Sequence, residues 1–448
     1  MTITSFIVLF LMILSLVFIF AVRFSFIRLE ISNRVNLFLY NFYWHIRFLL
    51  SISFKKKFVK NWKLTHQRKK NLLNLAIFNE NKNKYTETFV RNHFENLRFN
   101  KVFYYGLPPQ FIHPWGDIVS DNHLWKQFKL AFLKLLEIDE KTYFSNRLRK
   151  SLKKKKIEIA LAEFGTMGVY VYKACMQNSI PLVVIFHGYD AWHQDVVDKN
   201  KKEYVKMFSY ASKIIGVSRD ICSQLERLGC PKQKIVHLPS TINFKIFDFK
   251  IADRNLNRIL SVGRFSETKS PHLTILAFHE VLKEIPDATL VMVGKDGGGE
   301  LFEACHILVK ALKIEEKVEF KGVLSPDEVK NEMVRASVFV QHSITTPINN
   351  DKEGTPVSVM EAMACGLPVV ATRHAGIAEL INSGENGYLV EEYDYLSMAK
   401  QIVFCLKNPE LMNEIGCKSS LSISRNKLIA NNDSLLTQLL NEIVNLEK

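Results

Sequence analysis

The sequence predicts an α/β protein with two doubly wound domains that face each other across a cleft. At 448 residues, the chain exceeds what one hydrophobic core normally supports. After Lys70, short β-branched or aliphatic runs alternate with longer helical patterns, which is typical of βαβ units around a parallel sheet. A second such series begins at Arg258. In this architecture ligands bind at the carboxyl ends of the strands.

The expected strands fall into two sets separated by an irregular connection at residues 240–257. The first set is 73–78, 102–105, 157–162, 182–186, 213–217 and 235–238, and the second is 259–262, 289–293, 318–320, 338–341, 368–371 and 387–390. An amphipathic helix is expected at residues 434–446. The chain is expected to divide into two N-terminal segments, 1–24 and 25–70, followed by two α/β domains, 71–250 and 251–448.

The net charge of +15 does not indicate nucleic-acid binding, because of where it lies. Residues 1–70 contain 12 Lys and Arg and a single acid, Glu30, so the rest of the chain carries only +4. The seven cysteines form no CxxC pair and are odd in number. This argues against a disulfide framework or a zinc site and favours a reducing compartment.

Residues 3–22 form an uncharged apolar run of 20 residues, about the length that crosses a bilayer as a helix. A cleaved signal peptide is the alternative, but the run lacks a positive n-region and a small-residue cleavage site. Arg23, Arg28 and Arg34 follow the run, and the positive-inside rule places them in the cytoplasm. We therefore expect a single-pass anchor in the cell membrane, contact with inner-membrane lipid, and domains 71–250 and 251–448 on the cytoplasmic side.

Residues 25–70 continue with aromatic side chains mixed with lysines, a composition that suits the lipid headgroup zone. The alternative is a solvated basic helix with a partly buried aromatic stripe. The membrane interpretation is favoured because the expected span lies directly before this segment.

The densest chemical signal lies between Glu353 and Pro368. Thr355 suits an N-cap, Pro356 the first helical position and Gly366 the C-cap, so a helix is expected at about 356–365. Its N-terminus, reached through Gly354, is a suitable site for a diphosphate. Glu353 would precede this helix and Glu361 would lie within it, so that both carboxylates face one ligand.

This segment resembles the Glu-x7-Glu signature of the retaining glycosyltransferases of family 4, which have the GT-B fold of two Rossmann-like domains. The resemblance covers most of residues 72–410 and is strongest to enzymes of bacterial exopolysaccharide and lipopolysaccharide synthesis. It implies that Glu353 contacts the donor sugar near the reacting carbon and that Glu361 binds the ribose. Gly354, Thr355, Pro356 and Val357 would belong to the same donor site.

Gly263, Arg264 and Lys269 follow an expected strand and resemble the family's Gly-Arg-…-Lys segment. The resemblance implies that the two cations hold the donor diphosphate and stabilise the leaving nucleotide, as a departing diphosphate requires. The alternative is a pair of surface cations at a strand–helix turn. Val323 matches the strand end where the family places the nucleotide base.

His187 and Asp190 lie in a His-Gly-x-Asp segment at the end of an expected buried strand. The resemblance implies that His187 hydrogen-bonds the donor sugar or its phosphate. Glu87 matches the start of the family's first helix near the acceptor, although residues 79–84 lack the glycine loop of many members. Glu87 and Asp190 are therefore weaker acceptor-side candidates.

The resemblance implies an enzyme that moves a sugar from a nucleotide sugar to a saccharide or glycolipid acceptor with retention. No Asp-x-Asp motif precedes the donor site and metal-ligand spacing of His and Cys is absent, so we expect no metal cofactor. Two alternatives remain at this point. One is a non-catalytic membrane-tethered GT-B module in a polysaccharide assembly complex, and the other is a nucleotide-sugar epimerase of the same fold.

Overall fold

The computed structural model describes residues 72–81, 88–107, 109, 111–113, 116–117, 140–249, 254, 257–295 and 300–446. The chain separates into two compact units, Met1–Arg68 and Lys69–Lys448, and the description concerns the second. The expected membrane span, the basic aromatic segment and Glu87 lie outside the described residues. Among the helices that are described, none combines the length and the apolar character needed to cross a membrane.

The first sheet has eight strands in the order β4-β3-β2-β1-β5-β6-β7-β8. Its strands are β1 (Asn74–Asn79), β2 (Asn100–Tyr105), β3 (Phe111–His113), β4 (Gly116–Asp117), β5 (Ile159–Glu163), β6 (Leu182–Phe186), β7 (Lys213–Gly216) and β8 (Ile235–His237). All neighbours from β2 to β8 are parallel, whereas β3 and β4 are antiparallel additions. The order reverses between β1 and β5, and ligand sites of doubly wound sheets lie at such a reversal.

The second sheet has six parallel strands in the order β11-β10-β9-β12-β13-β14. Its strands are β9 (Arg258–Val262), β10 (Thr289–Val293), β11 (Val318–Gly322), β12 (Val338–Gln341), β13 (Val369–Thr372) and β14 (Tyr388–Val390). The order reverses between β9 and β12. The predicted pair of parallel Rossmann-like sheets is therefore confirmed.

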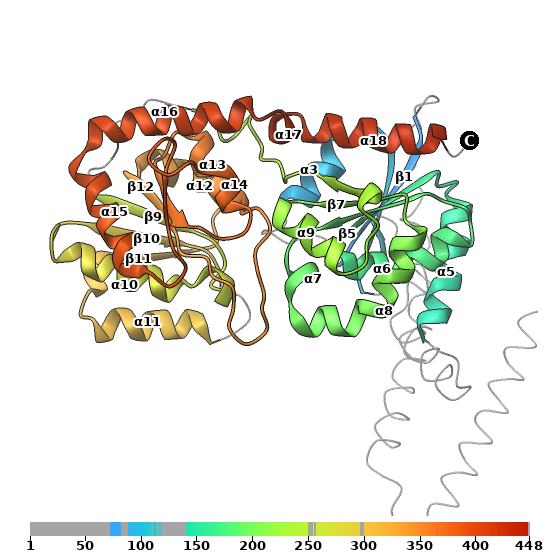
Figure 1. The fold of residues 1–448 in the computed structure, drawn as a ribbon, viewed down its shortest axis with the longest axis horizontal. Helices are drawn as coiled ribbons and strands as arrows, with labels where there is room; N and C mark the ends of the chain where they lie inside the picture. Colours follow the sequence, from blue (N-terminus) through green and yellow to red (C-terminus); the bar gives the residue numbers. More distant parts are fainter. Residues whose placement is uncertain are drawn as a thin grey trace, which may run out of the picture. The chain divides into compact units, whose positions relative to one another are not determined.

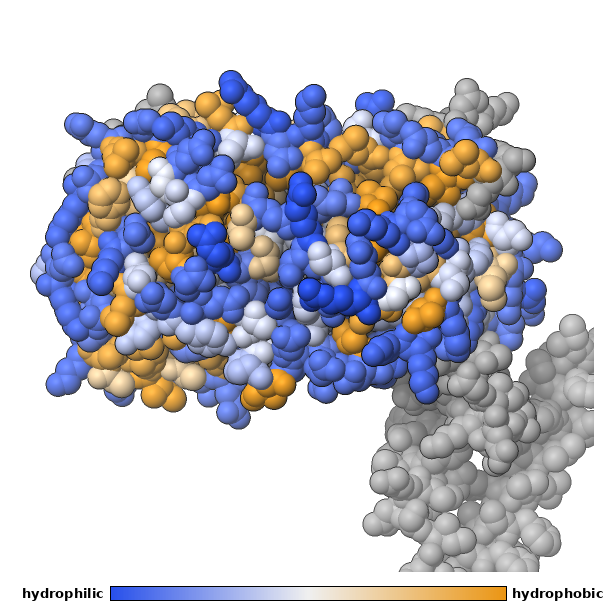
Figure 2. All heavy atoms as spheres, viewed as in Figure 1, coloured by the Kyte–Doolittle hydropathy of each residue, from blue (hydrophilic) through white to orange (hydrophobic). Residues whose placement is uncertain are grey.

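Helices connect the strands and cover both faces of each sheet (Figure 1). Those of the first sheet are α3 (Thr88–Asn96), α5 (Glu140–Lys154), α6 (Gly165–Met176), α7 (Tyr189–Trp192), α8 (Gln194–Tyr210) and α9 (Arg219–Arg227). Those that follow are α10 (Pro271–Leu282), α11 (Leu301–Ala311), α12 (Pro326–Arg335), α13 (Val357–Ala364), α14 (Ile377–Leu380), α15 (Tyr395–Lys407), α16 (Pro409–Arg425), α17 (Lys427–Ala430) and α18 (Asn432–Leu446). Hydrophilic side chains cover most of the face drawn in Figure 2.

Alternate residues of the second sheet belong to two separate hydrophobic clusters. Ile259, Leu290 and Val338 join the cluster that includes α10, α11 and α15. Their neighbours in the chain, such as Leu260 and Phe339, join the cluster that includes α12 and α13. Because successive side chains of a strand point to opposite faces, these apolar runs bury both faces of the sheet. Such runs are what made the strands predictable.

The C-terminal helix α18 returns to the first sheet. Its side chains Leu436, Leu440 and Ile443 are buried in the first hydrophobic cluster. The returning chain lies beside the outgoing connection, because Thr241 Oγ1 donates to the Ile429 carbonyl at 3.0 Å and Asn432 Nδ2 donates to the Pro239 carbonyl at 2.6 Å. A single domain boundary at residue 250 does not anticipate this return.

Arg254, in the connection between the sheets, binds the ends of two helices. Its guanidinium donates to the carbonyls of Met333, in the last turn of α12, and of Ala336, directly after that helix. It also donates to those of Cys365 and Gly366 after α13, and the four distances are 2.9 to 3.3 Å. Helix C-termini leave carbonyl groups unpaired and carry partial negative charge, which a cation stabilises. Arg254 therefore fixes the connection to the end of α13.

We expect Arg254→Ala to lower the melting temperature by about 5 °C, because several charge-assisted hydrogen bonds to partly buried carbonyls are lost. Differential scanning fluorimetry measures this shift. Lys245→Ala is the matched control, since it removes an exposed cation of the same connection. Equal melting temperatures for the two variants would contradict the role of Arg254.

Candidate functional site

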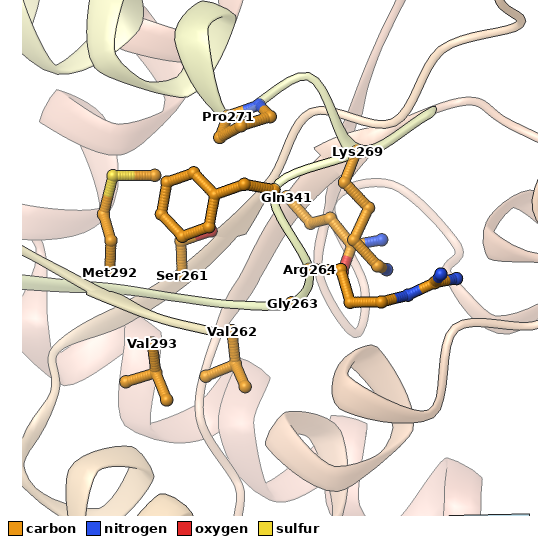
Figure 3. A pocket seen from close by; sticks show the side chains of 10 residues that line it. Ser261, Val262, Gly263, Arg264, Lys269, Pro271, Met292, Val293 and Gln341 are labelled. Atoms are coloured by element: carbon orange, nitrogen blue, oxygen red, sulfur yellow. The ribbon is translucent and has the colours of Figure 1, made fainter. Parts of the chain in front are cut away.

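The loops that follow β9 and β12 lie next to each other at the strand reversal of the second sheet. A pocket at this place is lined by Ser261, Val262, Gly263, Arg264, Phe265, Lys269, Pro271, Met292, Val293 and Gln341. The Ile344 amide donates to the Thr268 carbonyl at 2.9 Å, which joins the two loops. In Figure 3, Arg264 and Lys269 extend together beyond the end of β9, away from Val262 and Val293. The reversal point thus carries two cations.

Lys269 and Glu353 form a largely buried ion pair, with 2.9 Å between Lys269 Nζ and Glu353 Oε2. Burial opposes ionisation of Glu353, but the ammonium of Lys269, with smaller contributions from His374 and Arg264, keeps the pKa of Glu353 below its usual value. Gly263 makes room for this pair. A Cβ at Gly263 would lie 2.6 Å from Lys269 Cδ, so a side chain there would displace the lysine.

Arg264 is exposed. Its guanidinium forms no hydrogen bond or ion pair with the described residues, although its charge acts on Glu353 and Asp351. It differs in this respect from Lys269, whose charge is matched by Glu353. Arg264 therefore presents a cation without an ion pair, and its planar set of donors suits a phosphate or carboxylate.

A row of hydrogen bonds holds the main chain of Glu353. The Glu353 amide donates to His374 Nε2 at 3.2 Å, and His374 Nδ1 is 2.6 Å from Glu392 Oε1. Glu392 also accepts from the Thr345 amide at 2.7 Å. Burial opposes ionisation of Glu392, but these bonds keep its pKa below the usual value. His374 and Glu392 thus fix the main chain of Glu353.

The helix after Glu353, α13, starts one residue later than predicted. Pro356 is its N-cap, and the expectation that Thr355 caps the helix is wrong. The Thr355 hydroxyl instead donates to the Val217 carbonyl, 2.6 Å away at the end of β7. The other end is also one residue off, because α13 ends at Ala364 and its C-cap is Cys365, not Gly366. Gly366 follows the cap with φ 67°; its amide donates to the Met363 carbonyl, and the Leu367 amide donates to that of Ala362.

Glu361 lies one turn into α13 and is half-buried. Its carboxylate has no hydrogen bond or ion pair within the described part of the chain. Burial raises the pKa of Glu361 to about 8. A ligand that offers hydroxyl donors would stabilise the ionised form of this buried, unpaired carboxyl group.

The loop after β6 touches the loop that carries Glu353. A Cβ at Gly354 would lie 2.2 Å from the His187 carbonyl oxygen, and one at Gly188 would lie 2.7 Å from the Lys352 carbonyl oxygen. Gly188 also has φ 135°, which other residues rarely adopt. The predicted residues His187, Gly354 and Glu353 are therefore brought together by direct backbone contact.

The ring of His187 binds a buried carboxylate that the sequence did not single out. His187 Nε2 is 2.9 Å from Glu163 Oε2, and Glu163 Oε1 is 2.7 Å from His93 Nδ1. Asp190 is fully buried, and its carboxylate accepts from the amides of Gly165, His187 and Gly188 at 2.7 to 3.1 Å. Asp190 therefore shapes the loop in this structure and has no exposed atom with which to contact an acceptor.

Val323 is 47% exposed, directly after β11. It is close in the fold to the cationic loop, because the Gly294 amide donates to the Gly322 carbonyl at 2.8 Å and the Gly263 amide donates to that of Val293 at 2.9 Å. The ends of β9, β10 and β11 thus form one edge. Within the described ranges, no group of three or more His, Cys, Asp or Glu side chains could hold a metal ion.

Further contacts that the sequence did not indicate connect the part of the chain around Glu353 to the helices and strands of the first sheet. Lys352 Nζ lies 3.9 Å above the ring of Trp192 and 3.8 Å from Asp220 Oδ2. Glu379 accepts from the Arg219 amide at 2.6 Å and lies 3.3 Å from His237 Nε2. These residues come from helices and strands of both sheets, so no local motif could have revealed them.

Two family models match adjacent parts of the chain. The model described as "Glycosyltransferase Family 4" matches residues 114–245, and that described as "Glycosyl transferases group 1" matches residues 243–420. Together they cover more than half of the sequence, including every site residue described above except His93.

Curated relatives and solved structures agree with these matches. The putative colanic acid biosynthesis glycosyltransferase WcaL of Escherichia coli is 32% identical over 55% of this chain and 60% of the relative. The amylovoran biosynthesis glycosyltransferase AmsK of Erwinia amylovora is 30% identical over 54% of this chain and 60% of the relative. The chain thus spans about 60% of the length of these relatives. Anabaena HepE, crystallised with UDP and glucose, shares the fold with a TM-score of 0.66 at 18% identity, covering 82% of this chain and 99% of HepE.

We expect a double-mutant cycle of Lys269→Met and Glu353→Gln to show coupling. Each single variant leaves one buried partner unmatched and lowers the melting temperature, whereas the double variant loses less than the sum, with a coupling of about 1–3 kcal/mol.

The pH dependence of the coupling follows from the depressed pKa of Glu353. The ion pair stabilises the fold above the ordinary carboxyl value of about 4.3, and this contribution is lost as the pH falls through the lower folded value. Melting curves at neutral and acidic pH measure it. Additive effects at pH 7 would contradict the pairing.

Proposed function

The chain belongs to glycosyltransferase family 4, and on that premise we propose that it transfers a sugar from a nucleotide sugar to a saccharide or lipid-linked saccharide acceptor in cell-surface polysaccharide biosynthesis. The observation that carries the proposal is the group at the reversal of the second sheet. There, the unmatched cation Arg264 and the Lys269–Glu353 pair lie at the end of β9, and the loop of Glu353 leads into α13.

This group supports the binding of a nucleoside diphosphate. The amide groups at the start of α13 and the guanidinium of Arg264 supply donors and positive charge for the diphosphate. Glu361 supplies an acceptor for the ribose hydroxyls, and the strand edge at Val323 is available for the base. HepE was crystallised with UDP, and we propose that this chain also takes a UDP-sugar.

In the proposed reaction, the bond between the sugar anomeric carbon and the leaving phosphate oxygen breaks. The acceptor hydroxyl attacks the same face, which retains the anomeric configuration, and its proton passes to the departing phosphate oxygen. Arg264 and Lys269 stabilise the negative charge that develops on that diphosphate. The loop of Glu353 contacts the main chain of the His187–Gly188 turn, and we propose that the Glu353 carboxylate holds the donor sugar there.

The acceptor class and the location are proposed from the relatives and the N-terminal residues. WcaL and AmsK take their names from colanic acid and amylovoran biosynthesis, and we propose an exopolysaccharide or related chain as the product here. We also propose that residues 3–22 anchor the protein in the membrane with its sheets on the cytoplasmic side. Protease accessibility of the full chain in inverted membrane vesicles tests this orientation.

We expect Glu353→Gln to reduce sugar transfer at least about 100-fold, because it removes the carboxylate at the proposed reaction centre. The assay screens a nucleotide-sugar panel by thermal stabilisation and then measures acceptor-dependent release of the nucleotide. Glu284→Gln, which removes a carboxylate paired with Lys407 outside the site, is the control.

Retained transfer by Glu353→Gln would reject the catalytic assignment. Failure of the wild-type protein to bind or consume any nucleotide sugar would favour the non-catalytic module. Consumption of the donor without an added acceptor would favour an epimerase.

We expect the affinity for UDP to rise about tenfold between pH 7 and pH 9. The pKa of Glu361 in the free protein is about 8, and ribose hydroxyls bind its ionised form more strongly, so raising the pH favours the complex. Isothermal titration calorimetry across this range measures the effect. Glu361→Gln is expected to bind more weakly and without this dependence, and an identical pH profile in both proteins would contradict the role of Glu361.

A further inference from the structure

One aromatic side chain is exposed where the first sheet meets the loop of Glu353. Tyr189 is the first residue of α7, directly after the His187–Gly188 turn, and it is 47% exposed. The other three residues of this short helix are buried. An exposed tyrosine in this position offers an apolar ring and a polar hydroxyl to a ligand.

Hydrogen bonds join the turns that follow β1, β5 and β6 beside this tyrosine. Thr166 Oγ1, after β5, donates to Glu80 Oε1, after β1, at 2.7 Å. The Gly165 amide donates to Oδ2 of Asp190, the residue next to Tyr189, at 2.7 Å. These bonds span the place where the strand order reverses between β1 and β5. Tyr189 thus lies at the edge where doubly wound sheets bind their ligands.

A loop of the second sheet reaches the same ring through His193. The centroids of the Tyr189 and His193 rings are 5.0 Å apart, and the ring planes make an angle of 63°. His193 Nε2 lies 3.1 Å from Asn349 Nδ2, and the Asn349 carbonyl accepts from the Gln194 amide at 2.7 Å. Asn349 belongs to the loop that leads to Glu353. The ring of Tyr189 is therefore close to the proposed reaction centre.

The electrostatic surroundings of Tyr189 are negative. Burial raises the pKa of its phenol, and so do four carboxylates, those of Glu80, Asp351, Asp190 and Asp195. Asp351 connects this region to the donor site. Burial raises the pKa of Asp351 to about 6, Glu353 adds to this effect, and His193 and Arg264 oppose it. The carboxylate of Asp351 is thus within electrostatic reach of both Arg264 and Tyr189.

We propose that Tyr189 is the platform on which the acceptor sugar stacks, and that the carboxylates around it select a sugar without negative charge. The C–H groups on one face of a pyranose carry partial positive charge, which suits the negative face of an aromatic ring. The sugar hydroxyls can donate to the carboxylates. This deepens the proposed function, on which it rests, because a stacked sugar is an acceptor only if a nucleotide sugar is the donor.

The charges of the two sides then sort the two substrates. A uronic acid on Tyr189 would place its carboxylate among like charges, and this repulsion is weakly screened in a partly buried place. A neutral hexose meets no such repulsion. Arg264 and Lys269 attract the anionic nucleotide sugar, whereas the surroundings of Tyr189 disfavour it. The acceptor side is thereby kept free for an uncharged sugar.

Saturation-transfer NMR in the presence of UDP tests the selection. The probes are the methyl glycosides of glucose, galactose and mannose and those of the matching uronic acids. At neutral pH and low ionic strength we expect the uronic acid to bind at least about tenfold more weakly than the matching hexose, with a smaller difference at high salt. Glu80→Gln keeps an acceptor for Thr166 but loses the charge, so we expect it to narrow the difference about threefold.

Variants of Tyr189 test the platform itself. We expect Tyr189→Phe to bind the hexoside within about twofold of the wild-type protein, and Tyr189→Leu to bind it about tenfold more weakly, because leucine has no ring face. In sugar transfer, Tyr189→Leu raises the acceptor KM by the same factor and leaves the donor KM and the affinity for UDP unchanged. Phe404→Leu is the matched control, since Phe404 is a partly exposed ring of α15, outside the site.

Equal binding of the hexoside by Tyr189→Leu and the wild-type protein would overturn the platform, and so would failure of the wild-type protein to bind every hexoside. Equal or tighter binding of the uronic acids would overturn the selection by charge, and this comparison needs only the wild-type protein if Tyr189→Leu does not fold. If the wild-type protein binds a hexoside through Tyr189 but consumes no nucleotide sugar, the sugar subsite is supported and the proposed transfer reaction is rejected.

Discussion

The site depends on the close approach of two main chains, the turn at His187–Gly188 and the turn at Lys352–Gly354. A Cβ at Gly354 would lie 2.2 Å from the His187 carbonyl oxygen, which is far inside van der Waals contact. Because the glycines allow the backbones to touch, Glu353 lies next to the turn that follows β6 of the first sheet. The surrounding contacts, such as Lys352 above Trp192 and Thr355 on Val217, fasten this arrangement. The geometry of the site therefore depends on Gly188 and Gly354, which have no side chains to separate the two turns.

Much of the fold could be predicted from local patterns. The strands at 182–186, 289–293 and 338–341 have the bounds that the sequence predicts, because each is a largely apolar run buried on both faces. The short strands β3 and β4 were missed, since two or three residues carry no periodicity. The helix end at Gly366 was predictable because a left-handed residue there requires glycine.

The candidate site was predictable where its residues follow one another in the chain. Lys269 and Glu353 are 84 residues apart, and it was a resemblance to a family, and not spacing, that joined them. Glu163 and His93 were missed because neither lies in a motif, and they meet only through a contact between α3 and β5. The prediction for Thr355 was wrong for a similar reason. A threonine before a proline suits an N-cap locally, but the Thr355 hydroxyl donates to the Val217 carbonyl, which follows a strand of the other sheet.

The charges of the site explain how a carboxylate can lie beside a diphosphate. A lone Glu353 would repel the phosphates, and in a buried place that repulsion is weakly screened. Lys269 removes the difficulty because it neutralises Glu353 before any ligand arrives. Arg264, which has no carboxylate partner among the described residues, is then left with its full charge for the ligand. The buried carboxylate of Glu163 is also matched locally, since it lies 2.7 Å from His93 Nδ1 and 2.9 Å from His187 Nε2. In each case a buried anion is matched locally, so that the unmatched charge of the site is positive and lies where the diphosphate is proposed to bind.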